Sequence, residues 1–136
     1  LQGSAGVEFA SATLADSSAR PTVIADEFVA ARGFRRIGFN WEMLDPQAVR
    51  NVPRSALDEI TKAFAHDIAN PSRPWLSAAT AEQCALAFLD AFEPNSRTIL
   101  SNRYDGLWNP ISGAAVEWGF VAYDADAIGL LLLTDR

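Results

Sequence analysis

The hydrophobic pattern is strongest near the end of the chain, where two apolar runs flank a short polar stretch. In the first run, 116–123, apolar residues alternate so that Trp118 and Phe120 share one face, as in a half-buried strand. The second run, 128–133, is apolar on both faces and too short to cross a bilayer, which is typical of a strand covered from both sides. We therefore predict a β-hairpin over 116–134 whose second strand is central.

Upstream of the hairpin the apolar spacing becomes helical. Residues 21–33 open with proline and close with glycine, which predicts a three-turn amphipathic helix. The clearest helix is 55–69, with Ser55 and Asp58 as a capping pair and an apolar stripe along one side. A further helix is predicted over 80–93, opened by a capping box at its first residue, and we expect these last two helices to be neighbours.

The remaining segments carry weaker signals. Residues 1–20 have no sustained period and are predicted to form a loosely ordered N-terminal arm, with a short edge strand around Val7 to Phe9 as the alternative. Residues 34–41 alternate like a strand or an extended segment, and residues 45–49 can form a short helical turn. Residues 98–104 are predicted to be a short strand that leads into a turn.

Together these elements predict one domain, residues 21–136, of the α+β class. Helices come before the main strands, so we expect them to pack on a mainly antiparallel sheet that ends in the C-terminal β-hairpin. A chain of 136 residues is long enough to bury about two thirds of its unfolded surface around a single core.

Charge and composition narrow the range of partners. A net charge of −6 argues against direct nucleic-acid binding, because phosphate recognition needs clustered Lys and Arg, and it favours a basic partner. No apolar segment is long enough to cross a membrane, and the N-terminus lacks the pattern of a secretory signal. The single Cys84 excludes an internal disulfide, so a reducing, cytoplasmic location is expected.

Catalytic chemistry has little support in the residue pattern. His66 could serve as a base and Cys84, near a helix N-terminus, as a reactive thiol, but a solvated histidine and a packed cysteine are the commoner situations. One histidine and one cysteine cannot form a Cys/His zinc site, and the isolated glycines form no phosphate loop. We expect no catalytic residue, metal or cofactor, while a dyad of His66 and Cys84 stays open.

Acidic and aromatic residues occur in the stretch Tyr104-Asp105-Gly106-Leu107-Trp108 and in the hairpin, and we predict that they gather around one end of it. This mixture suits contact with a cationic protein surface, and it also occurs where aromatic residues line the edge of a core. Both interpretations stay open. The candidate partner-binding residues are Asp105, Trp108, Glu117, Tyr123, Asp124 and Asp126.

The segment from Trp108 to Asp124, WNPISGAAVEWGFVAYD, followed by Ile128-Gly129-Leu130-Leu131, resembles the ending of small bacterial immunity proteins that accompany polymorphic toxins. The resemblance implies a protein without catalytic activity that binds a cognate toxin domain in the cytoplasm and occludes its active site. A basic toxin would suit an acidic inhibitor. On this hypothesis Asp105, Glu117, Asp124 and Asp126 supply charge, while Trp108 and Tyr123 act as anchors.

Two other classes stay open. A small enzyme or ligand-binding domain would have a pocket between helices and sheet that contains His66 or Cys84. A purely structural subunit would instead have an extensive apolar interface with its own copies.

Overall fold

The computed structural model describes residues 5–45, 55–104 and 107–135, and the predicted turns at 46–49 and 105–106 lie outside them. The strands of the main sheet are β1 (Ala5–Thr13), β2 (Glu42–Met43), β5 (Thr98–Ser101), β8 (Val116–Tyr123) and β9 (Ala127–Asp135). The helices are α1 (Pro21–Ala30), α2 (Ala56–Ala65) and α3 (Ala78–Leu89), with a 3₁₀ turn η1 (Gly38–Asn40). Two small strand pairs complete the fold: β3 (His66–Asp67) with β4 (Asn70–Pro74), and β6 (Arg103–Tyr104) with β7 (Leu107–Trp108).

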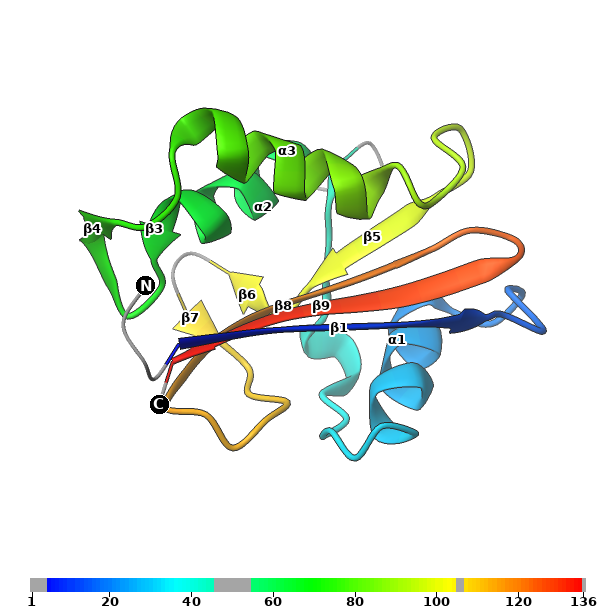
Figure 1. Cartoon of the computed structure of the whole chain (residues 1–136). Helices are drawn as coiled ribbons and strands as arrows, with labels where there is room; N and C mark the ends of the chain where they lie inside the picture. Colours follow the sequence, from blue (N-terminus) through cyan, green and yellow to red (C-terminus); the bar gives the residue numbers. More distant parts are fainter. Residues whose placement is uncertain (1–4, 46–54, 105–106, 136) are drawn as a thin grey trace.

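The molecule has three layers, with the main sheet in the middle. Figure 1 shows α2 and α3 above the sheet and α1 below it. The strand order is β1-β9-β8-β5-β2, and each neighbouring pair is antiparallel. The predicted α+β class, with helices on a mainly antiparallel sheet, is therefore confirmed. Among the described helices, none has the length and apolar character needed to cross a bilayer.

The predicted C-terminal hairpin is present as β8 and β9. Its register places Trp118 opposite Leu133 and Tyr123 opposite Ile128. The predicted central position of β9 is also confirmed, since β9 lies between β8 and β1 and is buried on both faces. β8 differs from the prediction, because both of its faces are buried. Trp118 belongs to the core under α2 and α3, whereas Val121 belongs to the core over α1.

Residues 5–13 form an edge strand rather than a loosely ordered arm. β1 pairs with β9 along its full length, so the suggested strand at Val7 to Phe9 was too short. Small residues such as Ala10 and Ser11 have little preference for strands, so the sequence predicts a strand here only weakly. Pairing with the distant β9 supplies the hydrogen bonds that hold this segment extended. The domain therefore includes β1.

Residues 34–41 form a loop and the 3₁₀ turn η1 rather than a strand. The cause is Asp26 of α1, whose buried carboxylate accepts hydrogen bonds from this segment. The backbone N–H groups of Ile37 and Gly38 donate at 2.9 and 3.0 Å, and Trp41 Nε1 donates at 2.8 Å. A buried carboxylate needs such partners, so the loop is tied to the helix.

The predicted helices α2 and α3 are present, with changed ends. Ser55 caps α2 as predicted, since its Oγ accepts the N–H of Asp58 at 3.2 Å. The helix ends at Ala65 rather than at residue 69, because β3 follows directly and pairs with β4. α3 begins earlier than predicted, with Ser77 as the N-cap that accepts the N–H of Thr80. The expected contact between the two helices is confirmed.

Candidate functional site

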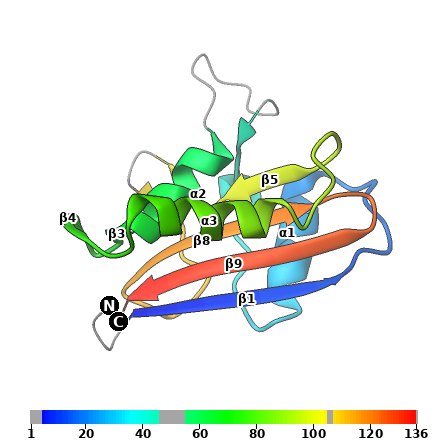
Figure 2. The same cartoon turned by 45° about the horizontal axis from the view of Figure 1, so that its top comes forward.

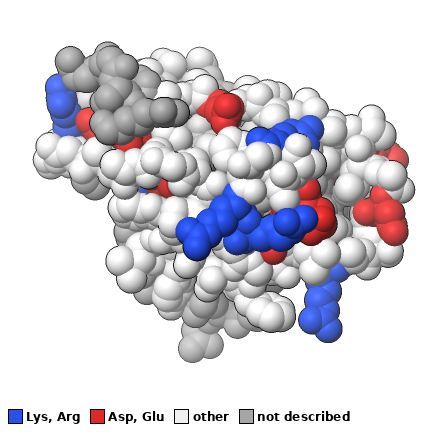
Figure 3. Space-filling model, turned by 90° about the horizontal axis from the view of Figure 1, so that it is seen from below, with Lys and Arg blue, Asp and Glu red and all other residues white. Residues whose placement is uncertain are grey.

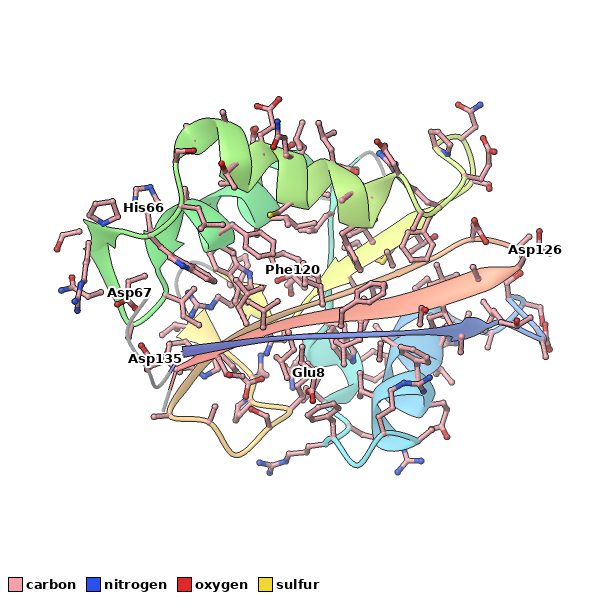
Figure 4. The ribbon with its side chains drawn as sticks, in the orientation of Figure 1. Glu8, His66, Asp67, Phe120, Asp126 and Asp135 are labelled. Atoms are coloured by element: carbon pink, nitrogen blue, oxygen red, sulfur yellow. The ribbon has the colours of Figure 1, made fainter. Side chains whose placement is uncertain are left out.

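The predicted partner-binding residues do not form one surface. Glu117 lies near the open end of the hairpin, where it faces Thr134, whereas Asp126 lies in the turn at the other end. The stretch of β8 from Glu117 to Tyr123 alone corresponds to about 20 Å of extended chain. Figure 4 shows the same separation, with Asp126 at one end of the sheet and Asp135 at the other. The structure therefore divides the predicted site in two.

At the turn end, Asp124 has a structural role. Its Oδ2 accepts the N–H of Glu93 at 2.9 Å, and its Oδ1 accepts the N–H groups of Asp126 and Ala127, each at 2.8 Å. These backbone hydrogen bonds hold the pKa of Asp124 below its usual range. Tyr123 beside it is buried, which raises the pKa of its phenol and corrects its prediction as a surface anchor. Asp126 is exposed.

At the open end, Glu117 is fully buried, so it cannot supply charge to a partner surface as predicted. Its Oε2 accepts the N–H of Ile111 at 2.8 Å and the side-chain amide of Asn102 at 2.8 Å. Its Oε1 accepts the N–H and the hydroxyl of Ser112 at 3.0 and 2.7 Å. Four donors compensate for the loss of water around the carboxylate, so Glu117 holds the loop 109–115 against β8.

Asn102 separates β5 from β6 and extends the same polar network, so the predicted strand 98–104 is interrupted at this residue. Its side-chain nitrogen donates to the carbonyl of Asn109 at 3.1 Å as well as to Glu117. Its Oδ1 accepts the N–H of Gly119 at 2.8 Å. The side chain thus joins the start of the loop to the middle of the sheet.

Arg103 lies in a stack of aromatic rings beside Glu117. Its guanidinium lies 4.9 Å from the ring centroid of Trp108 and 4.6 Å from that of Trp118, and its Nε donates to the Glu117 carbonyl at 3.0 Å. Burial lowers the pKa of Arg103, and the Glu117 carboxylate partly opposes this effect. Since arginine stays protonated in proteins, the two rings hold a cation and Trp108 is fixed in place.

An exposed apolar group lies on the β6–β7 pair above this network. Leu107 is 73% exposed, and it lies directly opposite Tyr104, which is also exposed. Trp108 follows and is partly buried. We call Tyr104 and Leu107 the apolar platform. Trp108 points to the opposite face of the strand pair, where it stacks with Arg103. Asp105, the other predicted residue of this region, lies outside the described residues.

Comparison of the chain with protein-family models, with curated proteins and with solved structures finds no match.

The stretch 104–108 was noticed in the sequence, but only Asp105 and Trp108 of it were predicted as binding residues, and the network beneath it was not predicted. Leu107 is a single apolar residue beside a turn, and nothing in a linear pattern distinguishes it from a core residue. Asn102 and Arg103 were included in a predicted strand without a role. Their contacts with Glu117 connect segments that are 14 and 15 residues apart in the chain, so no local signal could have revealed them.

His66 and Cys84, the two residues of the possible catalytic dyad, lie in different environments. His66 is exposed at the start of β3, where Figure 4 shows it at the end of α2 with Asp67 nearby. The Asp67 carboxylate accepts the N–H of Ala69 at 2.9 Å. Cys84 is partly buried against the core beneath α3. These positions give no support to a catalytic dyad. Within the described parts of the chain, no group of three His, Cys, Asp or Glu side chains could hold a metal ion.

Charged side chains are unevenly distributed. Figure 3 shows the face that carries α1, with acidic side chains at the right-hand end, where the hairpin turn lies, and basic side chains nearer the middle. Part of the basic charge is used within the molecule. Arg36 forms an ion pair with Glu27 at 2.9 Å, and Arg32 lies 3.7 Å from the ring centroid of Phe28. Acidic side chains therefore lie at the turn end of this face.

Proposed function

We propose that this chain is a non-catalytic binding protein of the immunity type, which occludes the active site of a toxin-like partner protein through the apolar platform. The observation that carries the proposal is the 73% exposure of Leu107 on a strand pair held from beneath by a buried polar network. An exposed leucine is ordinary by itself, but here it lies beside exposed Tyr104, and partly buried Trp108 supports the strand pair from its inner face.

The composition of the platform supports a protein partner. Tyrosine is among the residues most enriched at positions that contribute strongly to binding energy, and Leu107 adds apolar area beside Tyr104. The platform directly precedes the segment that resembles immunity proteins, which starts at Trp108. The resemblance and the exposed side chains therefore favour the same part of the surface.

The network beneath the platform supports tight binding. Glu117 anchors the following loop, and the ring of Trp108 lies against the buried Arg103 guanidinium. Side chains that are already ordered lose less conformational entropy when a partner binds. The strand pair that carries the platform is thus preorganised for binding.

Charge supports a basic partner in the cytoplasm. The net charge is −6, and exposed Asp126 lies at the acidic turn end. Since Asp126 lies far from the platform along the hairpin, we assign it to long-range attraction of the partner rather than to the contact itself. An immunity protein of this type meets its toxin inside the producing cell.

The test is binding to the product of the neighbouring open reading frame, measured with the purified pair by calorimetry. Leu107→Asp should weaken binding by at least about thirtyfold, the effect of losing one strong interface residue. The matched control is Val23→Asp, which places the same charge at an exposed apolar position on α1. Asp126→Asn should slow association at low salt and leave dissociation unchanged.

Two outcomes would contradict the proposal. In one, the neighbouring product is toxic to cells, yet this chain neither binds nor neutralises it. In the other, the pair binds but Leu107→Asp has no more effect than Val23→Asp, which would place the interface elsewhere on the molecule.

A further inference from the structure

The outer edge of β1 is a second surface, separate from the apolar platform. β1 is the last strand on its side of the main sheet, next to β9, and Figure 2 shows it at the border of the sheet. It is nine residues long and pairs with β9 without a break in register. Within residues 5–45, 55–104 and 107–135, no strand lies on its other side.

The hydrogen-bond pattern shows which backbone groups of β1 face outward. Just beyond the strand, the N–H of Leu14 donates to the carbonyl of Asp126 at 2.9 Å and continues the β1–β9 register. Ladder hydrogen bonds alternate along an antiparallel strand, so even-numbered residues face β9 and odd-numbered residues face away. The outward-facing residues are Ala5, Val7, Phe9, Ser11 and Thr13.

The side chains along this edge do not block its pairing with another strand. Val7 is 48% and Phe9 is 56% exposed, and both lie on the α3 side, where the Phe9 ring meets the Phe88 ring edge-on at 6.0 Å. Edge strands are usually blocked by proline, lysine or a bulge. β1 has none of these, and Glu8 is its only charged residue.

We propose that β1 pairs antiparallel with β1 of a second copy of this chain, so that the two sheets become continuous across a two-fold axis. The strand overlaps itself completely only when the axis passes through Phe9, its middle residue. In that register the outward-facing Val7 lies opposite the outward-facing Ser11 of the second copy. Every outward N–H and C=O group of the strand then has a partner.

The same register also suits the side chains. Phe9 meets Phe9 of the second copy, which removes the most exposed ring of the edge from water in both molecules. Glu8 lies opposite Ala10 of the second copy rather than opposite Glu8, so no pair of like charges is created. This self-complementarity favours a second copy over an extended segment of another protein, which is the alternative that the test must exclude.

The first test is the molar mass of the purified full chain in solution, measured by light scattering and sedimentation over a range of concentrations. We expect a species of twice 14.7 kDa. Phe9→Lys should abolish it, while Phe39→Lys, at an exposed phenylalanine on η1, should not. Ser11→Pro removes only an outward-facing N–H and should also give monomer, with a circular dichroism spectrum like that of the unmodified chain.

The second test is the register, probed in a Cys84→Ala background. Phe9→Cys should form a disulfide-linked dimer under mild oxidation, because residues directly opposite in a hydrogen-bonded pair have Cα atoms about 5.5 Å apart. Thr13→Cys should not, since Thr13 lies opposite Ala5 of the second copy.

The proposal fails if the unmodified chain is monomeric at every concentration, or if Thr13→Cys cross-links and Phe9→Cys does not. A monomer whose binding to another protein is lost in Ser11→Pro would identify that protein as the occupant of the edge and would also overturn the proposal. The platform plays no part in this pairing, so Leu107→Asp should leave the molar mass unchanged.

Discussion

The side-chain carboxylate of Glu117 accepts the backbone N–H of Ile111 at 2.8 Å and so joins β8 to the loop that precedes it. Both residues are buried. The loop begins directly after Trp108, and the strand continues to the hairpin turn. Residues 108–124 are therefore held together by a buried carboxylate, which fixes the loop beside the proposed binding surface.

Replacing Glu117 with glutamine should destabilise the protein by about 2–4 kcal/mol. One carboxylate oxygen becomes an NH₂ group that faces other donors, and a buried network that is partly broken is costly. The measurement is chemical denaturation at neutral pH. The control is Glu8→Gln on exposed β1, which should change stability by no more than about 0.5 kcal/mol. Equal effects of the two substitutions would contradict the role given to Glu117.

Adjacent residues on α1 allow a buried and an exposed carboxylate to be compared. Asp26→Asn should cost about 1–3 kcal/mol, because at least one of the three N–H donors bound by this buried side chain loses its acceptor. Hydrogen exchange at Ile37 and Gly38 should become faster. Glu27→Gln removes only the exposed ion pair with Arg36, which solvent screens, so this substitution should leave the stability almost unchanged. If Glu27→Gln were the more damaging change, the assigned role of Asp26 would be wrong.

Asp124 should contribute a component of stability that depends on pH. Its pKa in the folded protein lies below the ordinary value of 3.8, so the contribution is present above that value and is lost as the pH falls through the folded pKa. Asp124→Asn should therefore reduce stability by about 1 kcal/mol at neutral pH and by less in acid. Denaturation at neutral pH and below pH 3.8 measures the change. The role given to Asp124 would be refuted if the difference in stability between the unmodified protein and Asp124→Asn stayed constant across this pH range. An equally large effect of Asp126→Asn would also refute it.

Several features of the fold could be predicted because they depend on local chemistry. The alternation of residues 116–123 and the apolar run 128–133 predicted the hairpin, and Ser55 predicted the start of α2. A period of two or a cap that bonds three residues ahead is determined by nearby atoms alone. The α+β class followed from the order of these elements.

The candidate site could be predicted only in part, because burial depends on contacts between distant segments. Glu117 and Tyr123 belong to the acidic and aromatic pattern of the hairpin, yet both are buried. Leu107 lies in the stretch 104–108 but was not predicted as a binding residue, yet it is 73% exposed. Glu117 and Tyr123 are buried because the loop 109–115 and α1 pack over the face of β8 that carries them. The alternation along the strand does not specify whether another segment covers that face.

The sequence by itself determined the hairpin, the three helices and the single cysteine and histidine, since residue spacing and composition act at short range. Only the tertiary structure decided that residues 5–13 are an edge strand and that Asp26 and Glu117 are buried and bind the backbone of neighbouring loops. The reason is that an edge, a buried carboxylate or a shared surface is created when segments far apart in the chain meet, and the free energy of such contacts depends on both partners.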